Sequence, residues 1–293
     1  MKNQIKLLDG SLSYPLENIG YNLNTKLWTA DALVNNPSLI SKIHEQYLRC
    51  GVDYISTSTY QVSIKSLRDL GYKISEIEKI FHRSVKLAKN AIKEFNTNKE
   101  IKILGSFGPF ATYLADGSEY TGLYNCSDEI IKNFHNENLK IIKKLDLNVI
   151  LYETIPSYKE VMILLDILNF CDKEVWISLT CNHKLELRDG SSLKEACMEI
   201  SKLENVSTVG INCIEPPLVA EAIRKLKKYS TKKVLIYPNS GELYNSNTKE
   251  WTGQKKLSKT HIKEWLKLSP DIIGGCCRVG TDTIKEINNQ INI

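Results

Sequence analysis

The 293-residue sequence lacks any apolar run that approaches the ~20 residues required for a membrane-spanning helix. It also lacks an excess of one charge. The formal net charge is only +5, and basic residues alternate with acidic ones, as in residues 69–95. Interleaved charges are typical of solvated helix faces rather than of a nucleic-acid surface or a basic membrane helix. We therefore expect neither a nucleic acid nor a membrane as a partner.

A secretory signal is missing from the first residues, because "MKNQIKLLDG" reaches an acidic residue and a turn almost at once. The eight cysteines are scattered along the chain rather than spaced as in a small disulfide-rich domain. This usage is typical of reduced thiols or of a metal site, so we expect a cytoplasmic protein. The cysteines are Cys50, Cys126, Cys171, Cys181, Cys197, Cys213, Cys276 and Cys277.

A glycine-rich phosphate turn of the G-x-G-x-x-G type, common after the first strand of a doubly wound sheet, is also absent. Instead, eight short apolar runs alternate with longer amphipathic segments, such as residues 127–146, 157–171 and 192–204. This alternation predicts an α/β fold, a (β/α)8 TIM barrel that forms one domain over residues 1–293. The strands are expected at residues 5–10, 52–59, 101–108, 147–154, 175–180, 206–213, 233–240 and 271–276.

Three connections that follow strands are long, at residues 12–36, 107–127 and 239–257. Long loops without periodic structure of their own usually have a functional role. In a barrel, all three would rise from the face that carries the carboxyl ends of the strands, where active sites lie.

Cysteines stand at the predicted ends of the sixth and eighth strands: Cys213 in "VGINC", and Cys276 with Cys277 in "IIGGCCRVG". Three thiolates with a vacant position are typical of a catalytic zinc site. The glycines Gly274 and Gly275 would let the backbone bend so that adjacent side chains reach one ion. Three buried packing cysteines, or a redox pair, remain alternatives on spacing alone.

Several stretches resemble the homocysteine S-methyltransferase family, and the resemblance extends from Asp9 to about Ile284. They are "LLDGSLSYPLE", "DYISTSTYQ", "LGSFGPFATYLADGSEYTG", "LYETIPSYKE", "VGINCIEPP", "YPNSGELYN" and "IIGGCCRVG". The resemblance implies a barrel that methylates the sulfur of L-homocysteine to give methionine. It also implies that Cys213, Cys276 and Cys277 bind a catalytic Zn²⁺.

The same resemblance assigns the substrate pocket. Asp9 and Glu153 match the carboxylates that hold the ammonium group of homocysteine. Further matching residues would line the pocket and offer backbone amides to a carboxylate. These are Thr57, Phe107, Gly108 and Asn212. Trp28 matches a position on the first loop, either as a cover for the site or as a packed anchor.

Some positions depart from the family pattern. The first motif is usually glycine-rich, but here it contains Ser11, Ser13 and Tyr14, and the segments after Arg278 and at residues 181–192 are also unusual. These differences concern the methyl donor rather than the metal.

The donor is expected to be S-methylmethionine or, less favourably, S-adenosylmethionine, because residues 114–124 and 237–245 resemble the branch that uses sulfonium compounds. No C-terminal arm like that of the betaine-using branch is seen, and the length excludes cobalamin or folate modules. We expect a monomer or homodimer with small-molecule partners only. The alternatives are betaine-dependent methyl transfer and a non-catalytic barrel that binds zinc or thiols.

Overall fold

The computed structural model describes residues 4–245 and 250–293, and its main element is a ring of eight parallel strands. The strand order is β1-β10-β7-β6-β5-β4-β3-β2, and a parallel bridge between Leu8 and Tyr54 closes the ring. The strands are β1 (Lys6–Leu7), β2 (Tyr54–Ser56), β3 (Lys102–Phe107), β4 (Val149–Ile155), β5 (Val175–Leu179), β6 (Val206–Asn212), β7 (Lys233–Tyr237) and β10 (Ile272–Ile273).

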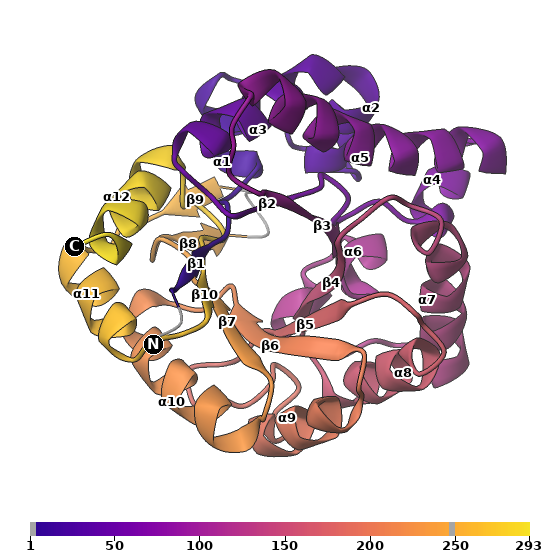
Figure 1. Cartoon of the computed structure of the whole chain (residues 1–293). Helices are drawn as coiled ribbons and strands as arrows, with labels where there is room; N and C mark the ends of the chain where they lie inside the picture. Colours follow the sequence, from indigo (N-terminus) through magenta and orange to yellow (C-terminus); the bar gives the residue numbers. More distant parts are fainter. Residues whose placement is uncertain (1–3, 246–249) are drawn as a thin grey trace.

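One main helix follows each barrel strand, and Figure 1 shows these helices around the outside of the strands. The predicted (β/α)8 barrel is therefore confirmed. The main helices are α3 (Pro37–Arg49), α5 (Ile74–Phe95), α7 (Asp128–Ile142), α8 (Tyr158–Leu168), α9 (Leu193–Lys202), α10 (Val219–Tyr229), α11 (Lys259–Lys267) and α12 (Thr281–Ile291). None of the helices within the described residues is long and apolar enough to cross a membrane.

Side chains fill the inside of the ring, so the barrel has a packed core rather than a pore. The largest is Trp176 of β5, which packs edge-on against Tyr54 of β2, with ring centroids 5.0 Å apart. A second and larger core lies between the strands and the outer helices. The remaining buried residues of the inner cluster are Leu8, Leu104, Val149, Leu151, Leu235, Tyr237 and Ile272.

The first and last barrel strands are much shorter than the sequence predicted, with two residues each. The chain after them leaves the ladder early, and Asp9 and Cys276 lie beyond the strand ends. Because they lie beyond the ladder, they are not bound by the alternation of side chains that a strand imposes.

The three long connections contain short elements of their own, contrary to the expectation of loops without regular structure. Figure 1 shows the hairpin of β8 and β9 close to the barrel ring. The elements in these connections are α1 (Ser13–Asn18), α2 (Thr29–Asn35), α6 (Ala111–Leu114), η1 (Ser118–Tyr120), β8 (Leu243–Asn245) and β9 (Glu250–Thr252). Two further short helices lie in other connections, α4 (Ile64–Asp69) and η2 (Pro216–Leu218). Residues 246–249 of the third connection lie outside the described residues.

A buried carboxylate fixes the ends of the connection at residues 107–127. Glu160 of α8 accepts hydrogen bonds from the backbone N–H of Phe110 (2.6 Å) and the hydroxyl of Tyr124 (2.7 Å). The Nε2 atom of His135 in α7 lies 2.7 Å from the same carboxylate. This connection is thus held to α8 near both of its ends, and α7 contacts the same carboxylate.

Candidate active site

The segment that contains Cys276 and Cys277 is a turn, held by the two residues that follow β7, Pro238 and Asn239. The N–H of Cys276 donates to the carbonyl of Pro238 (2.8 Å), and the N–H of Cys277 donates to the Oδ1 atom of Asn239 (3.1 Å). The Val279 N–H donates back to the Cys276 carbonyl (3.0 Å). Adjacent side chains in a turn need not point to opposite faces, so both thiols can face one point.

The two glycines before the turn allow a close approach rather than an unusual backbone bend. A Cβ atom on Gly274 would lie 2.8 Å from Cβ of Leu8 and 2.9 Å from the carbonyl oxygen of Asp9. A Cβ atom on Gly275 would lie 2.1 Å from Cγ1 of Val279. Neither glycine has a positive φ angle. The predicted role, to let the backbone bend, is therefore corrected: the two glycines leave room for neighbouring atoms.

Cys213 follows β6 in the left-handed region, with φ 53°, a conformation that costs energy for a residue with a side chain. Two contacts hold it there. Its N–H donates to the carbonyl of Tyr237 (3.3 Å), and the guanidinium group of Arg188 donates to its carbonyl (3.3 Å). Arg188 comes from the unusual fifth loop, and no motif in the sequence singles it out.

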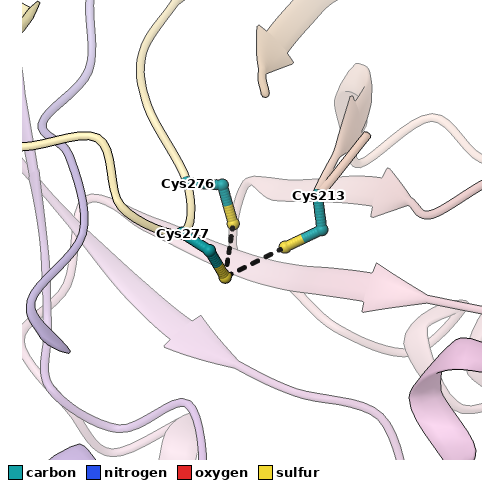
Figure 2. Close-up of side chains that lie close together, drawn as sticks. All are labelled: Cys213, Cys276 and Cys277. Carbon is teal, nitrogen blue, oxygen red and sulfur yellow. Dashed lines mark hydrogen bonds between the residues drawn. The ribbon is translucent and has the colours of Figure 1, made fainter. Parts of the chain in front are cut away.

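Figure 2 shows the side chains of Cys213, Cys276 and Cys277 pointing toward one another. The Sγ atoms of Cys213 and Cys277 are 3.9 Å apart, those of Cys276 and Cys277 are 4.0 Å apart, and all three lie within 4.8 Å. Tetrahedral zinc with Zn–S bonds of ~2.3 Å separates its sulfur ligands by ~3.8 Å, so the three residues fit such an ion.

The cysteine cluster is open on one side. Within the part of the chain that the structure describes, it is the only group of His, Cys, Asp or Glu side chains close enough together to hold a metal ion. No fourth protein ligand completes it, and all three cysteines line a cavity of about 520 Å³. Three ligands and an open position are typical of catalytic rather than structural zinc sites. Hydrogen bonds from the other two thiols lower the pKa of Cys276 well below its usual value.

Other cysteines lie away from this cavity. Cys181, which also follows a strand, is buried, and its burial raises the pKa of the thiol to about 12. It therefore stays protonated and packs as a small apolar side chain.

Asp9 and Glu153 both line the cavity next to the cysteines. The carboxylate of Asp9 accepts hydrogen bonds from the N–H (2.7 Å) and the hydroxyl (3.0 Å) of Ser56. Glu153 accepts a hydrogen bond from the hydroxyl of Ser106. Burial raises the pKa of Asp9 to about 7, and burial together with the nearby charge of Cys276 raises that of Glu153 to about 8.

An irregularity in β4 shapes the part of the cavity around Glu153. The register with β5 shifts between Tyr152 and Ile155, and Thr154 has φ 62°. Asn212, which is fully buried, accepts a hydrogen bond from the Thr154 N–H (3.0 Å) and donates to its hydroxyl (2.8 Å). Irregular strand ends of this kind commonly redirect a side chain next to an active site.

The other four residues that the sequence predicted for the pocket do not all line the cavity. Thr57 lines the cavity, and its hydroxyl accepts a hydrogen bond from the N–H of Ser106 (3.0 Å). Asn212 lies behind the cavity wall, with its amide nitrogen 3.8 Å from the Cys276 sulfur. Phe107 packs in the outer core, and Gly108 donates its N–H to the Tyr60 carbonyl (3.1 Å). Neither Phe107 nor Gly108 lines the cavity.

Comparisons with known proteins show the family of the chain. The family model described as homocysteine S-methyltransferase matches residues 6–291. The crystal structure of the metallated form of the homocysteine methyltransferase MmuM from Escherichia coli superposes with a TM-score of 0.87. It is 30% identical to the chain, and the match covers 99% of the chain and 97% of that structure.

The chain belongs to the homocysteine S-methyltransferase family. Among relatives, homocysteine S-methyltransferase 3 of Zea mays is 33% identical, with 98% of the chain and 90% of the relative covered. A selenocysteine Se-methyltransferase of Brassica oleracea var. italica is 30% identical, with 97% and 88% covered. The expected family and its methyltransferase class are thereby confirmed.

Within this member of the family, the unusual first loop is joined to the cysteine turn by Arg278. Its guanidinium group binds Glu17 of α1 (2.6 Å) and Glu242 (3.0 Å), and it lies 4.5 Å from the ring centre of Tyr14. Tyr14, a departure from the family motif, thus covers the arginine that follows the cysteines. The sequence offered no signal for the two carboxylate partners.

The close packing around Gly275 in the cysteine turn leads to a first prediction. Gly275→Ala should lower the free energy of unfolding by about 1–3 kcal/mol, because the new methyl group overlaps buried Val279. Urea denaturation would measure the loss. The same substitution in a Val279→Ala background should cost clearly less, since the overlap is relieved. An equal loss of unfolding free energy in both backgrounds would show that overlap with Val279 is not what requires a glycine at this position.

Proposed function

We propose that the chain is a zinc-dependent enzyme that transfers a methyl group from a sulfonium donor to the sulfur of L-homocysteine and forms methionine. The observation that carries this proposal is the position of three cysteine sulfurs, within 4.8 Å of one another, on the wall of a cavity that also contains Asp9 and Glu153. The family membership and the metallated form of the E. coli relative support it.

Cys213, Cys276 and Cys277 would hold the zinc ion. When bound, the metal would bind the homocysteine sulfur and keep it as a thiolate, the form that attacks a methyl carbon. The protein contributes the geometry: Asn212 and the residues after β7 hold the cysteines at their positions before any ligand arrives.

Asp9 and Glu153 would bind the ammonium group of homocysteine. Burial disfavours the charged forms of both carboxylates, and the charge of Asp9 adds to the rise in the pKa of Glu153. An ammonium group between them would favour the ionised forms and replace lost solvation with a charge-assisted hydrogen bond. A barrel that only stored zinc or thiols would not need this pair.

The lining of the cavity favours a cationic methyl donor. Among the described residues that line it, none is Lys, Arg or His, whereas five are Asp or Glu. Aromatic rings such as those of Trp28, Tyr60 and Tyr120 add faces that attract cations. S-methylmethionine and S-adenosylmethionine each bring a net positive charge, whereas betaine brings none. A sulfonium donor is therefore favoured over betaine.

The metal assignment predicts one zinc ion per chain, measured by elemental analysis of the purified protein. Replacing Cys213, Cys276 or Cys277 with Ala should empty the site and abolish methyl transfer. The matched control is Cys181→Ala, which removes a buried thiol outside the cavity and should keep the zinc. Full zinc occupancy in the three cavity variants would contradict the assignment.

The ammonium site predicts a selective effect on homocysteine. Asp9→Asn or Glu153→Gln should raise the KM for homocysteine by roughly 10-fold or more, because a charge-assisted hydrogen bond is lost, while zinc content stays unchanged. As a control, 4-sulfanylbutanoate, which is homocysteine without its amine, should be used equally poorly by wild type and variants. An unchanged homocysteine KM in both variants would place the ammonium elsewhere.

The donor assignment predicts an order of reactivity. With homocysteine as acceptor and all three donors at equal concentration, S-methylmethionine should be consumed fastest and S-adenosylmethionine more slowly, with betaine left unused. Product analysis by mass spectrometry with isotopically distinct methyl groups would give the order directly. Betaine turnover equal to that of either sulfonium would refute the donor class but not the metal chemistry.

A further inference from the structure

Glu119 has a buried carboxylate oxygen without a partner among the described residues. This atom, Oε2, accepts no hydrogen bond from the part of the chain that the structure describes. The residue lies in the short helix η1 and lines the cavity that holds the cysteines. Burial raises the pKa of Glu119, and a hydrogen bond from its own backbone N–H offsets only part of this effect. A buried carboxylate of this kind is costly unless a ligand supplies the missing partner.

The other cavity carboxylates already have identifiable partners or roles. Asp116 accepts a hydrogen bond from the N–H of Ser118 (2.9 Å) and so stabilises the turn before η1. Glu17 is paired with Arg278 at 2.6 Å. Asp9 and Glu153 form the pair beside the cysteines that we assign to homocysteine. Glu119 is therefore left over when one amino-acid substrate has been accommodated.

The position of Glu119 is fixed by its own loop. The N–H of Gly122 donates to the carbonyl of Ser118 (2.8 Å), which closes the turn around η1. The base of the loop is held by Glu160 through Phe110 and Tyr124. The carboxylate is thus presented by an ordered segment rather than by a free side chain on a mobile loop.

Two tyrosines share the cavity with Glu119 and the cysteines. Tyr60 and Tyr120 line the same cavity as Glu119 and the three cysteines, and Tyr120 is the residue after Glu119. A ligand that reaches from Glu119 to the sulfur cluster would therefore pass along aromatic rings. A sulfonium group is suited to such a path, because cations are attracted to aromatic faces.

We propose that Glu119 binds the α-ammonium group of an amino-acid methyl donor, so that the cavity has two ammonium sites, one for each substrate. This inference rests on the proposed methyl transfer. It adds that the donor is recognised through its amino group as well as its sulfonium group. S-methylmethionine and S-adenosylmethionine both carry this group, whereas simple sulfonium compounds do not.

The test compares wild type with Glu119→Gln, which keeps the shape of the side chain and removes its charge. Two donors are used: S-methylmethionine and 4-dimethylsulfoniobutanoate, which is the same molecule without the amine. Glu119→Gln should raise the KM for S-methylmethionine by about 10- to 100-fold, the loss expected for one charge-assisted hydrogen bond. The KM for homocysteine and the KM for the amine-free donor should remain within twofold of wild type.

Glu129→Gln is the matched control, because Glu129 is exposed in the first turn of α7 and outside the cavity, yet the change in net charge is the same. It should leave every KM unchanged. The inference would be overturned by an unchanged KM for S-methylmethionine in Glu119→Gln. It would also be overturned by an equal loss with both donors, which would mean that the carboxylate acts on the sulfonium group.

A direct binding measurement distinguishes a failure of this inference from a failure of the proposed function. If wild type transferred no methyl group from any donor, the proposed function would fail. Calorimetric titration of S-methylmethionine would still show whether wild type binds it more tightly than Glu119→Gln does. Equal affinities would overturn the ammonium site by themselves, whatever the activity.

Discussion

The candidate active site depends on the close approach of the chain after β10 to the chain after β1. The N–H of Gly275 donates to the Asp9 carbonyl (3.1 Å), and the space beside Gly274 is already occupied by Leu8. This contact places the cysteine turn and the carboxylate of Asp9 in fixed relation to each other, although more than 260 residues separate them in the sequence. Side chains larger than hydrogen at the two glycines would separate them.

The sequence was sufficient to predict the features that recur along the chain or within a motif. The alternation of apolar strands and amphipathic helices predicted the barrel, because strands buried on both faces have a recognisable composition. The spacing of Cys213 from Cys276 and Cys277 identified the cluster that the structure brings within 4.8 Å. Parallel strands in a barrel end on the same face, so strand-end residues can be assigned to one site without a structure.

The sequence was not sufficient where packing, rather than periodicity, decides the position of a side chain. Phe107 and Gly108 lie in a motif at the end of β3, but the ring of Phe107 turns toward Phe81 in the outer core (6.3 Å between centroids). Arg188 gave no sequence signal, because its role comes from a contact with Cys213, which belongs to a different part of the barrel. Which side of a strand end faces the cavity depends on such local contacts.

The buried carboxylate of Glu160 has a consequence for how the cavity can bind a ligand. It fastens the connection at residues 107–127 near both ends, through Phe110 and Tyr124. A segment that is already ordered loses little conformational entropy when a ligand arrives, so less of the interaction energy is spent on ordering it. What this connection adds to ligand affinity is therefore set by its contacts with the ligand rather than by the ordering of a mobile segment.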